Sequence, residues 1–418
     1  MKNRYTIIFV ALLFGFSQIL LGQKDCSALP SGLIPLTDFS PGILYRGYTG
    51  GLFGNDLNLK TGKHREDAIT FSKNIVPRSA NGLPDDHGLI GFIGIGASNP
   101  RTEFNAFVDM AKQNIRLNSK LVFANTCIGG QGIQKMKNID DNYWKSALKV
   151  LDSLKLSQEQ VQVAWIETDN TAQGDTSFPN APMNLAAEYQ QLLVTVKHYF
   201  PNIKICYLAA RGYSGFAMPT PGGVGKGLLH PRDYLNGWAV RFVVEHLIQQ
   251  KPGYEYEGAQ ATIPFTTWGN YSWNDGNLAR KDGFYLDCNT DIGSDGLHLT
   301  ALGEQKIGNL MYTFFSTDES CVSWFFNTTT ATKETNKSGN QSILLSNLIP
   351  TGNQELSINP RVEIIDIQIF DAQGKLMSSN FQEKLNSISI SAFNKGIYLI
   401  QVKTKEDQVP RSEKFVIY

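Results

Sequence analysis

Hydrophobic and polar positions follow a mixed pattern of short apolar runs and helical periodicity from about residue 89 to residue 316. The apolar runs predict strands, and the amphipathic runs that follow them predict helices. Apolar strands that alternate with amphipathic helices predict a parallel sheet covered on both faces. The predicted strands are residues 89–95, 120–124, 161–166 and 203–209, and the predicted helices are residues 103–115, 143–154, 185–200, 234–249 and 301–315.

The pattern changes to a period of two beyond residue 342. Residues 362–370, 388–390 and 397–402 alternate between apolar and polar side chains, with a turn expected at residues 372–374. Short alternating strands with turn signals predict a small β-sandwich over residues 342–418.

The stretches between these segments complete the predicted domain organisation. Residues 327–341 are polar and free of aromatic side chains, which is the composition of a linker. Residues 23–88 are rich in Gly, Pro and Asp, and we expect them to form an extended lead-in that wraps the core. The large domain is therefore predicted to span residues 23–326.

The first 22 residues have the pattern of a secretory signal peptide. Lys2 and Arg4 precede an apolar run over residues 7–14, and a small residue stands before Gln23. This pattern predicts an exported protein, and no other apolar window is long enough to insert stably in a membrane.

Export permits disulfide bonds between the five cysteines of the chain. Cys288 with Cys321 is a plausible pair, and the odd count leaves at least one thiol over. The other cysteines are Cys26, Cys127 and Cys206.

Charge and motif content exclude several classes of function. The chain has 38 Lys and Arg against 38 Asp and Glu, so the formal net charge is zero. Nucleic-acid binding, which depends on an excess of basic side chains, is not predicted. The chain has no CxxC or HExxH spacing, so we predict no metal site and no other cofactor.

Candidate chemistry begins with the stretch GIGASNPRTEF at residues 94–104, where a predicted strand turns into a helix. Ser98 in this turn is either a helix cap or a nucleophile. Taken alone, the stretch favours the cap.

Three further loops supply groups that a nucleophilic serine would need. The first, residues 125–132, contains glycines whose backbone N–H groups can approach an oxyanion, although an ordinary turn has the same composition. The second, residues 167–170, offers Asn170 as a donor. In the third, Asp295 and His298 lie three residues apart before the last helix, so that the carboxylate can orient the imidazole that accepts the serine proton.

Together these four stretches resemble the blocks of the SGNH hydrolase superfamily, also called GDSL esterases, over roughly residues 89–316. The resemblance implies a flavodoxin-like three-layer α/β/α sandwich. It also implies a triad of nucleophile Ser98, His298 and Asp295, with an oxyanion hole made by the Ser98 N–H, Gly130 and an asparagine.

The chain departs from the family pattern at two places. Ala97 replaces the acidic residue that usually precedes the serine, and the third block reads Glu-Thr-Asp-Asn instead of Gly-x-Asn-Asp. Strict register would place Asp169 in the oxyanion position, where a carboxylate would repel the developing charge. We therefore assign this role to Asn170, with a shift of one residue.

Other stretches resemble secreted bacterial SGNH-type proteins. The segment 210–216 follows a predicted strand, and its Arg211 and Tyr213 are candidate substrate-binding residues. Trp268, with Tyr271 and Trp273, is a candidate surface for stacking on a sugar ring, although aromatic packing beneath a long loop explains the same residues.

The C-terminal segment resembles the type IX secretion sorting domains of Bacteroidetes proteins. Residues 367–375, 395–402 and 414–418 carry this resemblance, which implies the type IX secretion machinery as a partner and a secreted or cell-surface location. A small carbohydrate-binding β-module is the alternative.

These patterns predict a secreted serine esterase without a cofactor. An O-acyl ester of a carbohydrate, with acetyl as the first candidate, is the expected substrate, and lipid esters are the second. The alternative from another class is a non-catalytic carbohydrate-binding or adhesion protein on an SGNH scaffold, to which Ala97 and the altered third block would point.

Overall fold

The chain divides into two compact units, Met1–Asn327 and Thr328–Tyr418. The computed structural model describes residues 24–218 and 225–327 of the first unit. In the second unit it describes residues 344, 348–349, 355–358, 364–371, 376–380, 387–404 and 411–417. The predicted signal peptide, residues 328–341 of the predicted linker and the expected turn at residues 372–374 lie outside the described residues.

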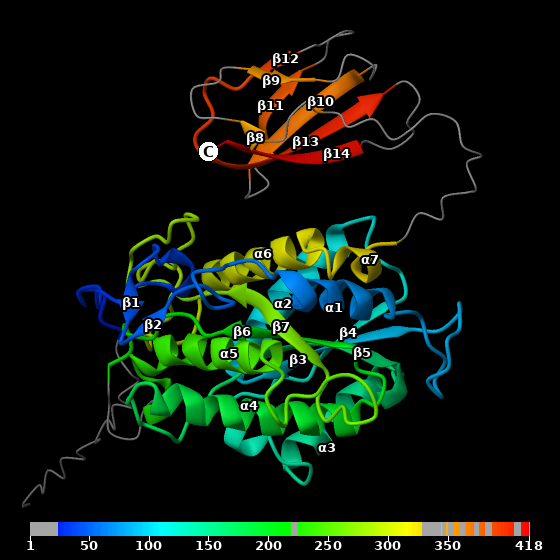
Figure 1. The fold of residues 1–418 in the computed structure, drawn as a ribbon, viewed down its shortest axis with the longest axis vertical. Helices are drawn as coiled ribbons and strands as arrows, with labels where there is room; N and C mark the ends of the chain where they lie inside the picture. Colours follow the sequence, from blue (N-terminus) through cyan, green and yellow to red (C-terminus); the bar gives the residue numbers. More distant parts are fainter. Residues whose placement is uncertain are drawn as a thin grey trace, which may run out of the picture. The chain divides into compact units, whose positions relative to one another are not determined.

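Five parallel strands form the central sheet of the first unit (Figure 1). They lie in the order β4-β3-β5-β6-β7, so the strand second along the chain stands at one edge and the remaining four follow in sequence. This 2-1-3-4-5 order is that of flavodoxin-like doubly wound sheets. The strands are β3 (Ile90–Gly96), β4 (Leu121–Asn125), β5 (Val161–Glu167), β6 (Ile205–Ala210) and β7 (Phe265–Tyr271).

Helices cover both faces of this sheet. Figure 1 shows α1, α2, α6 and α7 on one face and α3, α4 and α5 on the other. The helices are α1 (Gly62–Lys73), α2 (Ser98–Gln113), α3 (Asn142–Ser153), α4 (Asn180–Tyr199), α5 (Arg232–Ile248), α6 (Ala301–Thr317) and α7 (Val322–Phe325). Short 3-10 turns are η1 (Leu36–Asp38), η2 (Ile133–Lys135), η3 (Gln158–Gln160) and η4 (Lys226–Leu228).

The strand register brings the ends of three strands to one edge of the sheet. Gly94 of β3 pairs with Asn125 of β4, and Gly96 of β3 pairs with Glu167 of β5. Helix α2 starts directly above this edge and buries Phe104 and Phe107 against the sheet. Loops beyond the carboxyl ends of parallel strands form binding sites in folds of this kind.

A glycine at the end of β3 permits the close approach of α2. A Cβ at Gly96 would lie 2.4 Å from the Glu167 carbonyl oxygen and 2.6 Å from Pro100 Cβ. A larger residue here would push the first turn of α2 away from β5.

Several elements of the first unit were not predicted from the sequence. β7 lies in a region interpreted as a loop, and it is buried along its whole length. The lead-in is not extended throughout, because it contains helix α1 as well as the short strands β1 (Leu44–Tyr45) and β2 (Tyr48–Thr49).

The disulfide bond joins Cys26 to Cys288 across a sequence separation of 262 residues. The prediction of a Cys288–Cys321 pair is therefore wrong. Cys321 is a buried free thiol, as are Cys127 and Cys206. The bond fastens the start of the lead-in to the segment that precedes α6.

The second unit consists of two sheets around a core of its own. One sheet has the order β11-β10-β13-β14-β8, antiparallel except for the β14–β8 pair, and the other pairs β12 with β9. Ile367 and Ile400 of the first sheet share this core with Leu356 and Ile388 of the second. The strands are β8 (Leu348–Ile349), β9 (Glu355–Ser357), β10 (Ile364–Asp371), β11 (Leu376–Asn380), β12 (Ser387–Ser389), β13 (Gly396–Thr404) and β14 (Arg411–Ile417).

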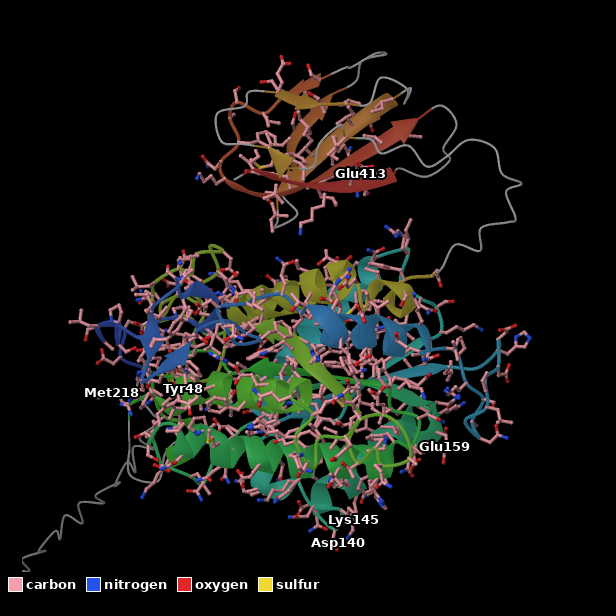
Figure 2. The ribbon with its side chains drawn as sticks, viewed as in Figure 1. Tyr48, Asp140, Lys145, Glu159, Met218 and Glu413 are labelled. Atoms are coloured by element: carbon pink, nitrogen blue, oxygen red, sulfur yellow. A yellow bond between two sulfur atoms is a disulfide. The ribbon has the colours of Figure 1, made fainter. Side chains whose placement is uncertain are left out.

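Side chains fill the layers between the helices and the sheet of the first unit (Figure 2). All six tryptophans of the chain lie in this unit, and all are buried. Within the described residues, we find no helix with the length and apolar character that a bilayer crossing requires.

Candidate active site

Ser98 is the first residue of α2, with Ala97 in the capping position before it. The Ser98 hydroxyl does not cap the helix, because its oxygen lies 2.8 Å from His298 Nε2. As a first-turn residue, Ser98 also has a backbone N–H without an acceptor inside the helix. The helix start thus offers both a hydroxyl and a free donor at one position.

His298 and Asp295 extend this contact into a hydrogen-bonded chain of three side chains. His298 Nδ1 lies 2.5 Å from Asp295 Oδ2, and its other ring nitrogen faces Ser98. Asp295 Oδ1 accepts the backbone N–H groups of Leu297 and His298 at 3.0 and 2.9 Å. A carboxylate held in this way fixes the ring orientation and supports a positive charge on the imidazole.

The hydrogen bonds to Asp295 keep its carboxylate ionised. Partial burial alone would raise the pKa of Asp295, but the bonds from the His298 ring and the two backbone N–H groups outweigh burial and lower it.

The loop that carries Asp295 and His298 is held from several directions. Gly296 has a φ of +74°, and a Cβ there would lie 2.3 Å from the Phe216 carbonyl oxygen, so only glycine fits. Lys24 Nζ donates to the carbonyl oxygens of Cys288 and Ile292, and the Lys24 N–H donates to the Ser294 carbonyl oxygen. Lys24, two residues before Cys26, therefore anchors the loop together with the Cys26–Cys288 bond.

The glycine loop after β4 lies beside Ser98. A Cβ at Gly129 would lie 3.8 Å from Ser98 Cβ, and Gly130 adopts a φ of +72°. Among the described residues, the Gly130 N–H has no hydrogen-bond acceptor. This donor is consequently available to a ligand near Ser98.

The structure does not bring Asn170 to the oxyanion position. Its amide nitrogen donates to both carboxylate oxygens of Glu188, at 2.8 and 2.9 Å, and its side-chain oxygen accepts the Ala172 N–H. Asp169 faces the pocket instead, as strict register would have it. The one-residue shift fails because the side chains of neighbouring residues at a strand end point in different directions.

Asp169 is held by two arginines. Arg232 Nη2 lies 2.9 Å from one carboxylate oxygen and Arg211 Nη1 lies 3.4 Å from the other, with all three side chains no more than 9% exposed. Burial raises the pKa of Asp169, and the two guanidinium groups oppose that rise. The cluster closes one wall of the pocket.

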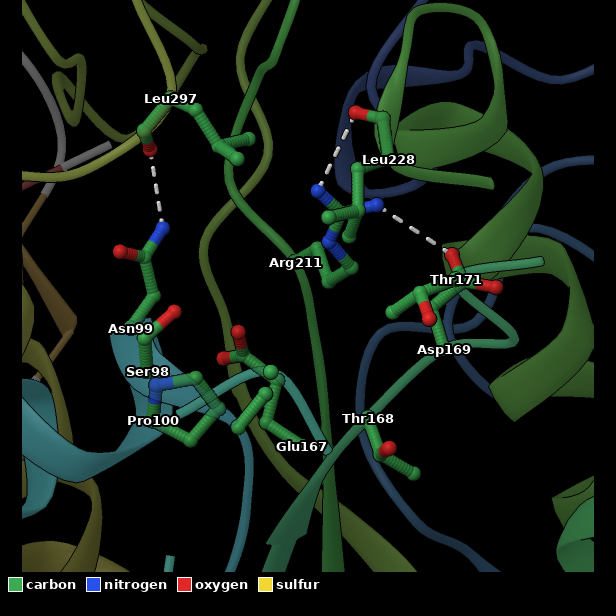
Figure 3. Close-up of a pocket in the computed structure, with 12 residues that line it drawn as sticks. Ser98, Asn99, Pro100, Glu167, Thr168, Asp169, Thr171, Arg211, Leu228 and Leu297 are labelled. Carbon is green, nitrogen blue, oxygen red and sulfur yellow. Dashed lines mark hydrogen bonds and ion pairs between the residues drawn. The ribbon is translucent and has the colours of Figure 1, made fainter. Parts of the chain in front are cut away.

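The pocket beside Ser98 encloses about 470 Å³ of space that is continuous with solvent. In Figure 3, Ser98 and Asn99 lie on one side, Arg211 and Asp169 on the other, and the Glu167 side chain lies between them. Asn99 Nδ2 donates to the Leu297 carbonyl oxygen at 2.9 Å, which ties the helix start to the histidine loop. Gly130 and Leu228 complete much of the lining.

Of the three predicted substrate-binding residues, the structure places two near this pocket. Arg211 lines it, and Tyr213 lines a smaller hollow that adjoins it. Trp268 is 2% exposed within β7, and its indole N–H donates to the Leu52 carbonyl oxygen. The stacking role predicted for Trp268 is therefore wrong, because a fully packed ring offers no face to a sugar.

Sequence reasoning missed a pair of buried carboxyl groups next to the nucleophile. Glu103 projects from α2 and Glu167 ends β5, and their side chains face each other closely enough for a hydrogen bond. Burial raises the pKa of Glu103 to about 7 and raises that of Glu167 well above its usual range. A signal was present, since Glu167 directly continues the buried run Val163–Ile166, where a charged residue is unusual.

The described residues contain no cluster of three or more His, Cys, Asp or Glu side chains suited to a metal ion. The site itself brings together a hydroxyl, an imidazole, a carboxylate and two backbone donors.

Comparison with known proteins identifies the C-terminal segment. Residues 350–418 match the model of a secretion system C-terminal sorting domain. This segment marks the chain for type IX export, so the protein interacts with that secretion machinery and acts at the cell surface or outside the cell.

No curated protein matches the chain. Among solved structures, it is similar to a gut microbial diltiazem-metabolizing enzyme, with 15% identity, a TM-score of 0.29 and coverage of 56% of this chain and 48% of that one. It is also similar to an extracellular lipase from Streptomyces rimosus, with 10% identity, a TM-score of 0.27 and coverage of 52% and 95%. The CBM51-2 and INT domains of Clostridium perfringens ZmpB align over 17% of each chain, with 12% identity and a TM-score of 0.15. Scores at this level carry no argument about function.

Proposed function

We propose that the protein is a secreted serine esterase of the SGNH type that hydrolyses O-acyl esters, with acetyl esters of carbohydrates as the first candidates. One observation carries the proposal: Ser98, His298 and Asp295 form an unbroken hydrogen-bonded chain at the carboxyl edge of a parallel sheet. The strand order and the four sequence blocks support the SGNH assignment.

The geometry supports acylation of Ser98. His298 Nε2 accepts the Ser98 proton as the oxygen attacks the ester carbonyl, and Asp295 stabilises the imidazolium that forms. The N–H groups of Ser98 and Gly130 are placed to bind the oxyanion, at a helix start that also favours negative charge. Asn170 has no part in this scheme.

Deacylation uses the same groups in reverse. Acylation ends when His298 gives the Ser98 proton to the leaving alcohol. In deacylation His298 accepts a proton from the water that attacks the acyl carbonyl, and returns it to the Ser98 oxygen as the acid is released. Its ring is 48% exposed, so water and a bulky alcohol both have access to Nε2.

The rival function, a non-catalytic carbohydrate-binding protein, rests on Ala97 and the altered third block. Burial of Trp268 and Trp273 in the core removes the expected sugar-stacking surface for either function.

Replacement of Ser98 tests the proposal. We expect the folded wild type to hydrolyse 4-nitrophenyl acetate and to react with a fluorophosphonate at Ser98. The Ser98→Ala variant should lose both activities while it retains the wild-type near-UV circular dichroism. Turnover that survives in Ser98→Ala would exclude Ser98 as the nucleophile, and a folded wild type without turnover or labelling would favour the binding protein.

A further inference from the structure

The buried carboxyl groups of Glu103 and Glu167 have no part in the proposed triad, yet they lie directly behind it. Glu103 stands five positions after Ser98 on α2, and Glu167 pairs with Gly96, two residues before Ser98. Their placement next to the nucleophile requires an explanation of its own, because an unneeded buried acid pair is costly.

The two carboxyl groups bond to each other and to no other described group. Glu103 Oε2, Glu167 Oε2 and Asn99 Oδ1 are buried and have no partner outside the pair. Glu103 and Glu167 are 3% and 2% exposed. Buried polar atoms are nearly always satisfied in folded proteins. One proton shared by the pair satisfies one oxygen of each carboxyl group, so the second oxygen of each, like Asn99 Oδ1, still has room for a donor.

These unpartnered groups surround a hollow that opens toward Ser98. Glu167 and Asn99 line both the pocket beside Ser98 and the smaller hollow behind it, and Glu103 lines the smaller one. Figure 3 shows the Glu167 carboxyl group turned into the space between Ser98 and Arg211. A ligand bound at Ser98 is therefore within reach of Glu167.

The charges near Glu103 and Glu167 indicate which kind of ligand group can donate a hydrogen bond to them. Burial raises the pKa of both carboxyl groups, and the contact between them raises that of Glu167 further while it lowers that of Glu103, so the proton lies on Glu167. The charge of Arg211, which lines the same hollow, favours the ionised form of each. Two carboxyl groups in such contact hold one proton between them, so the pair has a single negative charge that Arg211 balances. A cationic ligand would meet Arg211, so a neutral hydroxyl donor fits best.

We propose that Glu167, backed by Glu103 and Arg211, is the specificity-determining residue of the site and accepts a hydrogen bond from a substrate hydroxyl close to the scissile ester. The enzyme is then selective for hydroxylated esters, as a partly acylated sugar would be, over esters of plain alcohols and acids. This inference rests on the proposed esterase function and names the substrate feature that the site recognises.

A series of small esters tests this selectivity in the full-length protein. Ethyl acetate has no hydroxyl, 2-hydroxyethyl acetate has one on the alcohol part, and ethyl glycolate has one on the acyl part. Their methyl ethers, 2-methoxyethyl acetate and ethyl methoxyacetate, have similar electronic effects but cannot donate. Acid release in a pH-stat gives kcat/KM for each.

We expect one hydroxylated ester to exceed its methyl ether in kcat/KM by about 2- to 10-fold, the contribution of a hydrogen bond to an uncharged acceptor. The ester that shows this preference identifies the part of the substrate that reaches Glu167. Wild-type protein that hydrolyses each ether as fast as its hydroxylated partner overturns the proposal, and this result needs no variant.

Variants assign the preference to Glu167. Glu167→Leu should abolish it, whereas Glu167→Gln should retain part of it because the amide oxygen still accepts a hydrogen bond. Asp109→Asn, an exposed change on α2, serves as the control and should behave as wild type. A preference that survives in Glu167→Leu overturns the assignment. Failure of the folded wild type to hydrolyse any ester would instead remove the proposed function and, with it, this subsite.

Discussion

The ion pairs of Asp169 provide the most direct test of the energetics described above. Replacement of Asp169 by Asn removes the charge that Arg232 and Arg211 share, in a place where the three side chains are 1–9% exposed. Arg232 Nε is already buried without a hydrogen-bond partner. The Arg232 side chain therefore has no spare acceptor nearby that could replace the lost carboxylate. Breaking a buried ion pair on one side costs about 3–5 kcal/mol.

We expect the lower end of that range, about 3 kcal/mol, because the introduced amide still offers one oxygen acceptor. At roughly 2–4 °C per kcal/mol for a unit of this size, the midpoint of thermal unfolding should fall by roughly 6–12 °C. Tryptophan fluorescence measures this unit alone, since all six tryptophans lie before residue 327. Asp152→Asn, at an exposed position of α3, is the control. An Asp169→Asn variant that unfolds at the wild-type temperature would refute the reasoning that the pair is buried and structurally required.

Two further predictions concern the catalytic loop and the acid pair. Cys26→Ser should lower the free energy of unfolding by about 2–4 kcal/mol and, because the loop with Asp295 and His298 is then less firmly placed, lower kcat for an acetyl ester by about 10- to 100-fold. Reductant should have the same effect on the wild type and none on the variant; equal activity of both proteins would contradict the anchoring role. Burial raises the pKa of Glu103 to about 7 in the folded state, with Glu304 adding to the rise and the hydrogen bond with Glu167 and the charge of Arg211 opposing it. Folding therefore favours the protonated form of Glu103. The free energy of unfolding should therefore fall as the pH rises from about 4.5 to about 7. Urea unfolding at pH 5 and pH 7 should show that this free energy falls less in Glu103→Gln than in the wild type. The same fall in both proteins would show that Glu103 does not titrate in this range.

The sequence was sufficient to predict the parallel sheet and the candidate nucleophile because both depend on local patterns. Four strands are apolar runs that end in turn residues, and Asp295 and His298 are close in sequence. β7 escaped detection since its Thr, Gly and Asn residues interrupt the apolar pattern, although every residue in it is buried. Helix α1 was hidden for a related reason, because it buries few of its residues.

Contacts between distant residues could not be predicted in this way. Cys26 and Cys288 are separated by 262 residues, and no spacing rule connects them. Asn170 was chosen for its chemistry, but the side chain that competes for its amide, Glu188, lies on the following helix. The acid pair likewise forms only when α2 is packed against β5.

The Cys26–Cys288 bond links the formation of the candidate active site to export. Disulfides form outside the reducing compartment in which the chain is made, and the sorting domain shows that the chain leaves that compartment. During synthesis the loop with Asp295 and His298 is thus held by hydrogen bonds alone, among them those of Lys24. The covalent fastening of the loop comes with export, so the place where the chain is delivered is also the place where its candidate active site becomes complete.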